Sequence, residues 1–188
     1  MTHALNRLHR WAKAFARRED GNVTLEFVII CPLMFWTHMA MYTYFDAFKE
    51  QTINQKAAFT VADLISRQAV VNSDFIDGSH SVFNTLVRSN TDTAIRVTSV
   101  TYDAEEDEYS VLWSQERGAD TALTSDMVKD WHAYLPVMYD TATVIVVETW
   151  SGFSPVFKIG MRDRTLHNFT FTRPRYSPAV GWEPAGGA

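Results

Sequence analysis

The sequence predicts an α+β protein in which one long N-terminal α-helix packs on a small antiparallel β-sheet. The first observation is an apolar stretch near the N-terminus that is long enough to cross a membrane. The second is the absence of Gly and Pro from residues 33–77, which lets a helix continue well past this stretch. The third is a change of hydrophobic period from 3.6 to 2 at Ala94, after which β-branched residues are frequent.

The apolar stretch contains 19 residues without Lys, Arg, Asp or Glu, between Glu26 and Asp46. As an α-helix that rises ~1.5 Å per residue it covers about 28 Å, close to the ~30 Å hydrocarbon core of a bilayer. We therefore predict one membrane-spanning helix over residues 22–46. Pro32 lies inside it and is expected to bend it, because proline removes one backbone donor.

The helix is expected to continue beyond the membrane, from about Asn22 to about Gln68. In its second half, apolar side chains recur at helical spacing and predict the stripe that packs under the outer domain. The stripe consists of Phe48, Phe59, Ala62 and Ile65.

Residues 1–21 form a short leader with five basic and two acidic side chains. Basic flanks of membrane spans stay in the cytoplasm, so we expect the N-terminus inside and residues 47–175 outside as one periplasmic or extracellular α+β domain. From Asn22 onward the chain has 12 basic and 20 acidic side chains, a formal charge of about −8. This balance argues against nucleic-acid binding, which requires a basic face.

The first part of the outer domain carries turn and capping signals at residues 72–74 and 77–79. They predict a second, short helix over residues 79–90. Alternating and β-branched residues then predict strands over 95–102 and 109–114, joined into an antiparallel hairpin by the acidic residues 103–108.

The second part begins with a short helical segment between Ser125 and Trp131. Residues 143–150 have an unbroken apolar centre, which is typical of a central strand covered on both faces, one of them by the long helix. Residues 166–172 alternate cleanly and predict the last of about four strands. The tail, residues 176–188, is rich in Gly and Pro and is expected to be loose.

The sequence lacks the common signatures of catalysis. It has no Gly-rich phosphate loop, no His-x-x-His pair and no Cys-x-x-Cys pair, and its single cysteine, Cys31, excludes an internal disulfide. The acidic segment 103–108 has two interpretations, a cation site or a solvated turn, and it lacks the Gly and spaced ligands of a calcium loop. We therefore expect no enzyme, no cofactor and no metal. The histidines after the leader lie far apart in sequence, at His38, His80, His132 and His167.

One motif stands at the start of the apolar stretch. Gly21 is followed after four residues by the pair Glu26-Phe27, with Pro32 shortly afterwards and a basic leader before it. This arrangement resembles the processing site of type IV prepilins, and most of all the TadE/TadF pseudopilins of the Flp (Tad) type IVb pilus. The resemblance is sharp over residues 17–34 and softer over residues 57–68.

The resemblance implies that residues 1–21 are a class III signal peptide and that a prepilin peptidase cuts between Gly21 and Asn22. Glu26 then neutralises the new α-amine of a neighbouring subunit, and the helix from Phe27 to Phe45 supplies the packing seam. The implied function is that of a minor pilin in the inner membrane, with its C-terminal domain in the periplasm and with incorporation into the pilus. The implied partners are other pilins, the inner-membrane assembly platform and membrane lipid.

A second interpretation uses the same span without cleavage. A Gly and an acid at the cytoplasmic edge of a signal anchor also occur in unrelated single-pass proteins. On this interpretation the protein is an unprocessed, membrane-anchored periplasmic binding or sensing domain. N-terminal sequencing of the protein from membranes separates the two interpretations.

Overall fold

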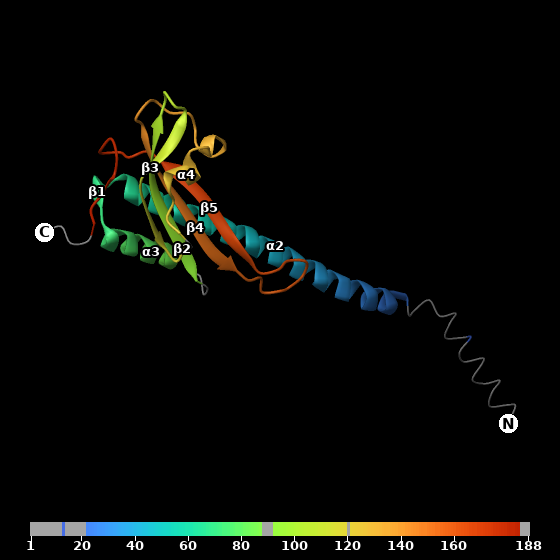
Figure 1. Cartoon of the computed structure of the whole chain (residues 1–188). Helices are drawn as coiled ribbons and strands as arrows, with labels where there is room; N and C mark the ends of the chain where they lie inside the picture. The colour runs from blue at the N-terminus through green and yellow to red at the C-terminus, as the bar shows by residue number, and fades with distance from the viewer. Residues whose placement is uncertain (1–12, 14–21, 88–91, 120, 185–188) are drawn as a thin grey trace.

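The computed structural model describes residues 13, 22–87, 92–119 and 121–184 of the chain. It has the α+β layout that the sequence predicts, with one long helix lying along a four-stranded antiparallel sheet (Figure 1). Helix α2 spans Asn22–Ser66 without interruption, with Pro32 inside it. The prediction of a continuous helix from about Asn22 to about Gln68 is confirmed.

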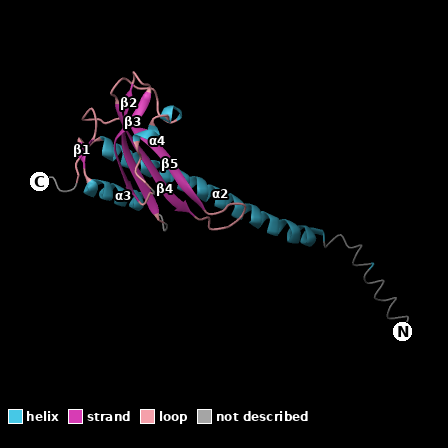
Figure 2. Cartoon of the chain, viewed as in Figure 1, coloured by secondary structure: helices cyan, strands magenta, loops and turns pink. Residues whose placement is uncertain are grey.

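Helix α2 has two halves with different surroundings. Its N-terminal half projects beyond the sheet, and its C-terminal half lies along the sheet (Figures 1 and 2). Thr43 is the first buried side chain, and buried positions recur from there at intervals of three and four residues. The buried apolar side chains of this half are Ala47, Ala57, Ala58, Val61, Ala62 and Ile65.

The helix face that packs on the sheet is therefore built mainly from small residues. Small side chains allow the helix axis to approach the sheet closely, and bulkier side chains remain on the other side. The prediction that Phe48 and Phe59 belong to the packing stripe is wrong, because their side chains are 72% and 52% exposed. Ala62 and Ile65, predicted with them, are buried as expected.

A second helix, α3, spans Ser73–Val87. Asn72 caps it, since its side-chain oxygen accepts a hydrogen bond from the Phe75 N–H at 2.9 Å. The sequence predicts a start at residue 79, so the helix begins six residues earlier than expected. The supposed turn at residues 77–79 is helical, and Gly78 lies on its exposed side with open space around it. The last predicted residues, 88–90, lie outside the described part of the chain.

The main sheet has the strand order β3-β2-β4-β5, and all neighbouring strands are antiparallel. All four strands coincide with predicted strands, and β4 lies inside the sheet as its apolar centre predicts. The strands span Thr93–Asp103 (β2), Glu108–Arg117 (β3), Thr143–Phe153 (β4) and Arg164–Thr172 (β5).

A β-bulge divides the sheet into two differently covered regions. Strand β3 pairs Trp113 with Ser99 and then Val111 with Val100, so Leu112 is the extra residue. Because side chains alternate across a strand, the bulge places Trp113 on the helix-covered face and Val111 on the opposite face. Each face therefore receives large apolar side chains from the same short strand.

The two faces carry separate hydrophobic cores. On one face, α2 and α3 pack against a cluster that contains Val97, Trp113 and Val147. On the other face, the segment between β3 and β4 covers Tyr109 and Val146. That segment includes α4 (Ser125–Val128) and a 3₁₀ turn, η2 (Trp131–Ala133), in the region where the sequence predicts a short helix.

Part of the tail is packed, unlike the loose tail that the sequence predicts. Strand β6 (Gly181–Trp182) pairs in parallel with β1 (Val70–Val71), directly after α2. Val180 is buried, and its carbonyl accepts a hydrogen bond from the Trp113 indole N–H at 2.7 Å. The apolar Val-x-Trp pattern within a Gly/Pro-rich segment thus fills a gap beside Trp113. Residues 185–188 lie outside the described part of the chain.

Candidate functional site

The exposed N-terminal half of α2 is the main candidate for a functional surface. Every described side chain from Val23 to Tyr42 is exposed apart from Cys31 and Ala40, which are half-buried. Within α2, the most apolar 18-residue window has a mean hydropathy of 1.6 and none of it is buried in the protein. A helix of this length and composition is suited to cross a membrane, and its apolar surface is otherwise unfavourable in water.

Polar side chains inside this segment satisfy themselves within the helix. The Thr37 hydroxyl donates to the Leu33 carbonyl at 2.9 Å, and His38 Nδ1 lies 2.8 Å from the Met34 carbonyl oxygen. Such i to i−4 contacts leave fewer polar groups unpaired in lipid. Both side chains are therefore compatible with a hydrocarbon environment.

The predicted processing motif lies at the very start of this helix. Gly21 is outside the described residues, and the described helix starts at Asn22, whose side chain is not described. Glu26 is exposed and forms no ion pair with any described residue. Residues 22 and 26 are one helical turn apart on the same face, so the carboxylate lies near the place where cleavage after Gly21 creates an amine.

Phe27 is 66% exposed and starts a surface that is apolar all around the helix. The apolar exposure does not end where the sheet begins. Phe45, Phe48 and Phe59 continue along the side of α2 away from the sheet, at 72%, 72% and 52% exposure. Their spacings of 3 and 11 residues keep them within about 60° of one another around the helix. We call these three residues the phenylalanine stripe.

A polar cluster that the sequence analysis missed lies on the sheet face opposite α2. Glu148, whose side chain is 7% exposed, accepts hydrogen bonds from Arg96 at 2.7 Å, and Arg96 also donates to the Thr121 carbonyl at 3.0 Å. His167 Nε2 lies 3.5 Å from the same carboxylate, and its ring stacks on Trp150 at 4.9 Å. The guanidinium of Arg96 lies 5.1 Å from the Trp150 ring centre, which completes a mutually supported group.

The acidic hairpin tip uses its carboxylates locally. The Asp103 side chain accepts hydrogen bonds from the backbone N–H groups of residues 105 and 106. Asp107 accepts from the Tyr102 hydroxyl at 2.5 Å and lies 3.2 Å from His132. The Tyr102 hydrogen bond lowers the pKa of Asp107 and raises the pKa of Tyr102 to about 12.

The histidines have separate partners in the structure. His80 contacts Thr93, while His132 and His167 lie beside Asp107 and Glu148. Among the described residues, no group of three or more His, Cys, Asp or Glu side chains is arranged to hold a metal ion. The acids of the tip are thus part of hydrogen-bonded turn and hairpin contacts.

The structure therefore leaves Glu26, Phe27 and the phenylalanine stripe on one exposed helix, and keeps the polar cluster on a separate face of the sheet. The acid of that cluster had a sequence signal, because Glu148 stands in the middle of the apolar strand 143–150. Its partners did not, since Arg96 is 52 residues away in sequence. Comparison with protein-family models, with curated proteins and with solved structures found no match to this chain.

Proposed function

We propose that the protein is a minor pilin or pseudopilin that is processed after Gly21 and assembles through its N-terminal helix in a Flp/Tad-type pilus. The proposal rests on the Gly21, Glu26-Phe27 motif and on the exposed helix that follows it. The partners are a prepilin peptidase, other pilins and the inner-membrane assembly platform. The N-terminus lies in the cytoplasm, and the sheet domain lies in the periplasm.

The phenylalanine stripe is the single observation that favours assembly over simple anchoring. A membrane anchor needs an apolar surface only within the bilayer. Phe59 lies 16 residues beyond Thr43, about 24 Å along the helix, and is still half exposed. Burial of such a side chain against a second helix stabilises a complex by about 1.5–3 kcal/mol. The stripe therefore fits a helix that packs against other helices both inside and outside the membrane.

Glu26 has a defined task in this proposal. An isolated carboxylate in an apolar environment is unfavourable, and so is an isolated α-amine. The amine created at residue 22 has an ordinary pKa near ~8 and is largely charged at neutral pH. Pairing with a Glu26 carboxylate of a neighbouring subunit neutralises both groups, and this allows the apolar helices to pack together without a buried net charge.

The decisive experiment is N-terminal sequencing of the protein from cells that assemble the pilus. The proposal expects the mature chain to start at Asn22, and the Gly21→Leu variant to remain full length in the membrane and to abolish pilus output. A substituted residue 21 obstructs the close approach of the peptidase to the backbone. A wild-type protein that retains residues 1–21 would instead support the membrane-anchored binding or sensing domain.

Assembly is tested separately in the same cells. Glu26→Gln is expected to be cleaved but to be lost from sheared pili and from crosslinks to other pilins. Phe59→Ser is also expected to be cleaved and to assemble less, whereas Lys56→Gln, a matched change at an exposed site on the same helix, is expected to assemble normally. If Glu26→Gln assembles fully, charge neutralisation is wrong; if Phe59→Ser does so, the stripe is not a packing surface.

A further inference from the structure

The loop between β4 and β5 lies beside α2 at the place where the exposed apolar helix ends. The Thr43 hydroxyl lies 3.4 Å from the Phe157 carbonyl oxygen, and the Phe157 ring contacts Tyr42 edge-on at 6.0 Å. The Tyr44 hydroxyl lies 3.4 Å from where a Cβ on Gly160 would stand. The loop is therefore held at one level of the helix, residues 42–44.

That level coincides with the expected outer surface of a membrane. Residues 23–42 form 20 residues of exposed helix, which cover about 30 Å, the thickness of the hydrocarbon core. If the cytoplasmic edge of the bilayer lies at the start of this helix, its outer edge lies at Tyr42. The β4–β5 loop then rests in the headgroup region, and tyrosines at this depth are typical of membrane interfaces.

The composition of the loop matches this location. Residues 154–164 alternate apolar and basic side chains, with three cations and one acid. Val156 is 66% exposed although nothing on the sheet requires an apolar residue there. Met161 is partly buried against the small cluster of Ala47, Phe153 and Leu166, and it fixes the loop to the helix. Apolar and basic residues side by side are suited to the boundary between acyl chains and phosphates.

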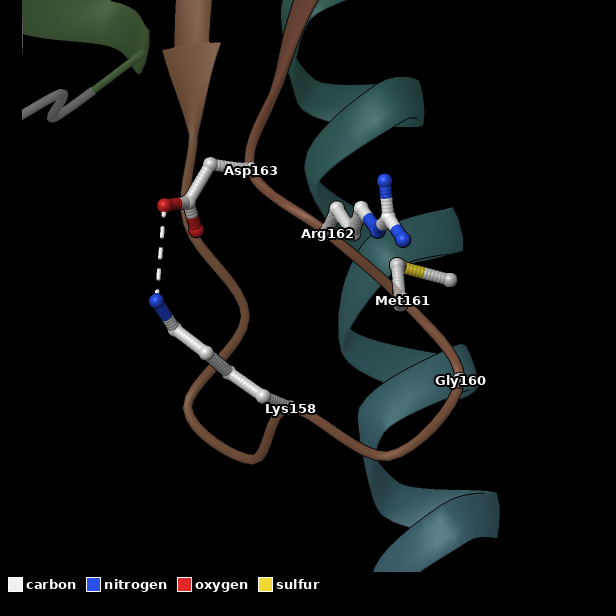
Figure 3. Close-up of a pocket in the computed structure, with 5 residues that line it drawn as sticks. All are labelled: Lys158, Gly160, Met161, Arg162 and Asp163. Atoms are coloured by element: carbon white, nitrogen blue, oxygen red, sulfur yellow. Dashed lines mark ion pairs between the residues drawn. The ribbon is translucent and has the colours of Figure 1, made fainter.

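The loop also encloses a hollow of about 720 Å³ lined by Lys158, Gly160, Met161, Arg162 and Asp163. Lys158 and Asp163 form an ion pair at 3.6 Å, and Asp163 also accepts a hydrogen bond from Ser154 at 2.7 Å. Figure 3 shows Arg162 pointing away from this pair. Arg162 has no ion-pair partner among the described residues, so its charge remains available to a ligand.

We propose that the β4–β5 loop is a binding site for anionic phospholipid headgroups on the outer surface of the membrane. Arg162 contacts the lipid phosphate, Lys158 adds positive charge beside it, and Val156 enters the upper acyl region. Bound lipid sets the height and tilt of the sheet domain above the bilayer before the subunit leaves the membrane. The inference rests on the membrane-spanning part of the proposed function and is independent of cleavage and pilus assembly.

The placement of the loop is tested with the full chain in lipid nanodiscs. The single native cysteine is first replaced by Cys31→Ala, and an environment-sensitive fluorophore is then attached through Val156→Cys. Its emission is expected to be blue-shifted and quenched by lipids that carry quenchers near the headgroup. The same label at Thr172→Cys, at the far end of β5, is expected to report water. A water-exposed label at residue 156 overturns the proposal.

A label at Met34→Cys in the same background checks the span itself. If it reports water, the membrane-spanning placement fails, and this outcome differs visibly from failure of the loop alone. A protected label at residue 34 with a water-exposed label at residue 156 leaves the span intact and rejects the lipid site.

The preference for lipid charge is tested by hydrogen exchange of the loop amides in nanodiscs with increasing phosphatidylglycerol in phosphatidylcholine. The loop is expected to be protected as phosphatidylglycerol increases. Loss of one cation near an anionic surface weakens its attraction about fivefold, so Arg162→Gln is expected to require about five times more phosphatidylglycerol. Arg173→Gln removes the same charge beyond the other end of β5, about 30 Å away, and is expected to change nothing.

Two outcomes of this titration reject the site. Equal protection in pure phosphatidylcholine and in mixed nanodiscs would show that lipid charge is not recognised. Equal protection by free inorganic phosphate added to phosphatidylcholine nanodiscs would show a site for soluble anions, not for a lipid headgroup.

Discussion

At the scale of single residues, Glu148 shows what sequence reasoning can and cannot provide. Its position inside an apolar strand indicates a carboxylate that must be compensated, because a buried charge without a partner is unfavourable. The partner, Arg96, lies on the adjacent strand β2 directly across the ladder. Its identity depends on strand order and register, neither of which is encoded in the local pattern. The pair therefore could be found only once the sheet had been assembled.

Breaking this pair is expected to be costly. Glu148→Ala leaves the Arg96 guanidinium, whose side chain is 14% exposed, without its counter-charge, and is expected to lower the free energy of unfolding by about 3–5 kcal/mol. The exposed pair of Lys129 and Glu108 is the control, and Lys129→Ala is expected to cost less than ~1 kcal/mol. Urea unfolding of the full chain in detergent, followed by tryptophan fluorescence, measures both. Equal small effects would mean that solvent screens the Arg96–Glu148 pair.

At the scale of elements, helix α2 was predicted well in extent and incorrectly in orientation. Its length follows from the absence of helix breakers, and this local property is readable in the sequence. Its packing face was assigned to the large apolar residues, whereas the sheet selects the small ones. The start of α3 was misplaced for a related reason, since Gly78 suggests a turn but lies harmlessly on a solvent-facing side. In both cases tertiary packing overrides local preference.

The close helix–sheet contact leads to a test by overpacking. Ala58 is fully buried between α2 and the sheet, so Ala58→Leu adds volume where the core has no space and is expected to destabilise the fold by about 1–3 kcal/mol. Thr60→Leu makes a comparable change on the exposed side of the same helix and is expected to be nearly neutral. The measurement is the thermal unfolding midpoint of each variant by circular dichroism. A neutral Ala58→Leu would show that the helix can shift away from the sheet at little cost.

At the scale of the whole molecule, the chain divides into a folded sheet domain and a helix that extends from it without a partner. This division is predictable from sequence, because hydropathy and the change of period are strong, local signals. The closure of the domain by its tail is not, because it joins residues 180–182 to the end of α2 across more than a hundred residues. The predicted motif at Gly21 and Glu26 depends on spacing alone, so its role stays a prediction until the N-terminus is sequenced.

The tail provides the last test of how the domain is held together. Removal of residues 178–188 deletes the buried Val180, strand β6 and the acceptor of the Trp113 indole N–H. Loss of one buried valine alone costs about 1.5–3 kcal/mol, and an unpaired buried donor adds about 1–3 kcal/mol. We therefore expect a marked fall in the unfolding midpoint and a red shift of tryptophan emission as water reaches Trp113. Removal of residues 185–188 deletes none of these contacts and is expected to leave both measurements unchanged. If the longer truncation unfolds at the same midpoint as the shorter one, the tail lies on the surface of a core that is already complete without it.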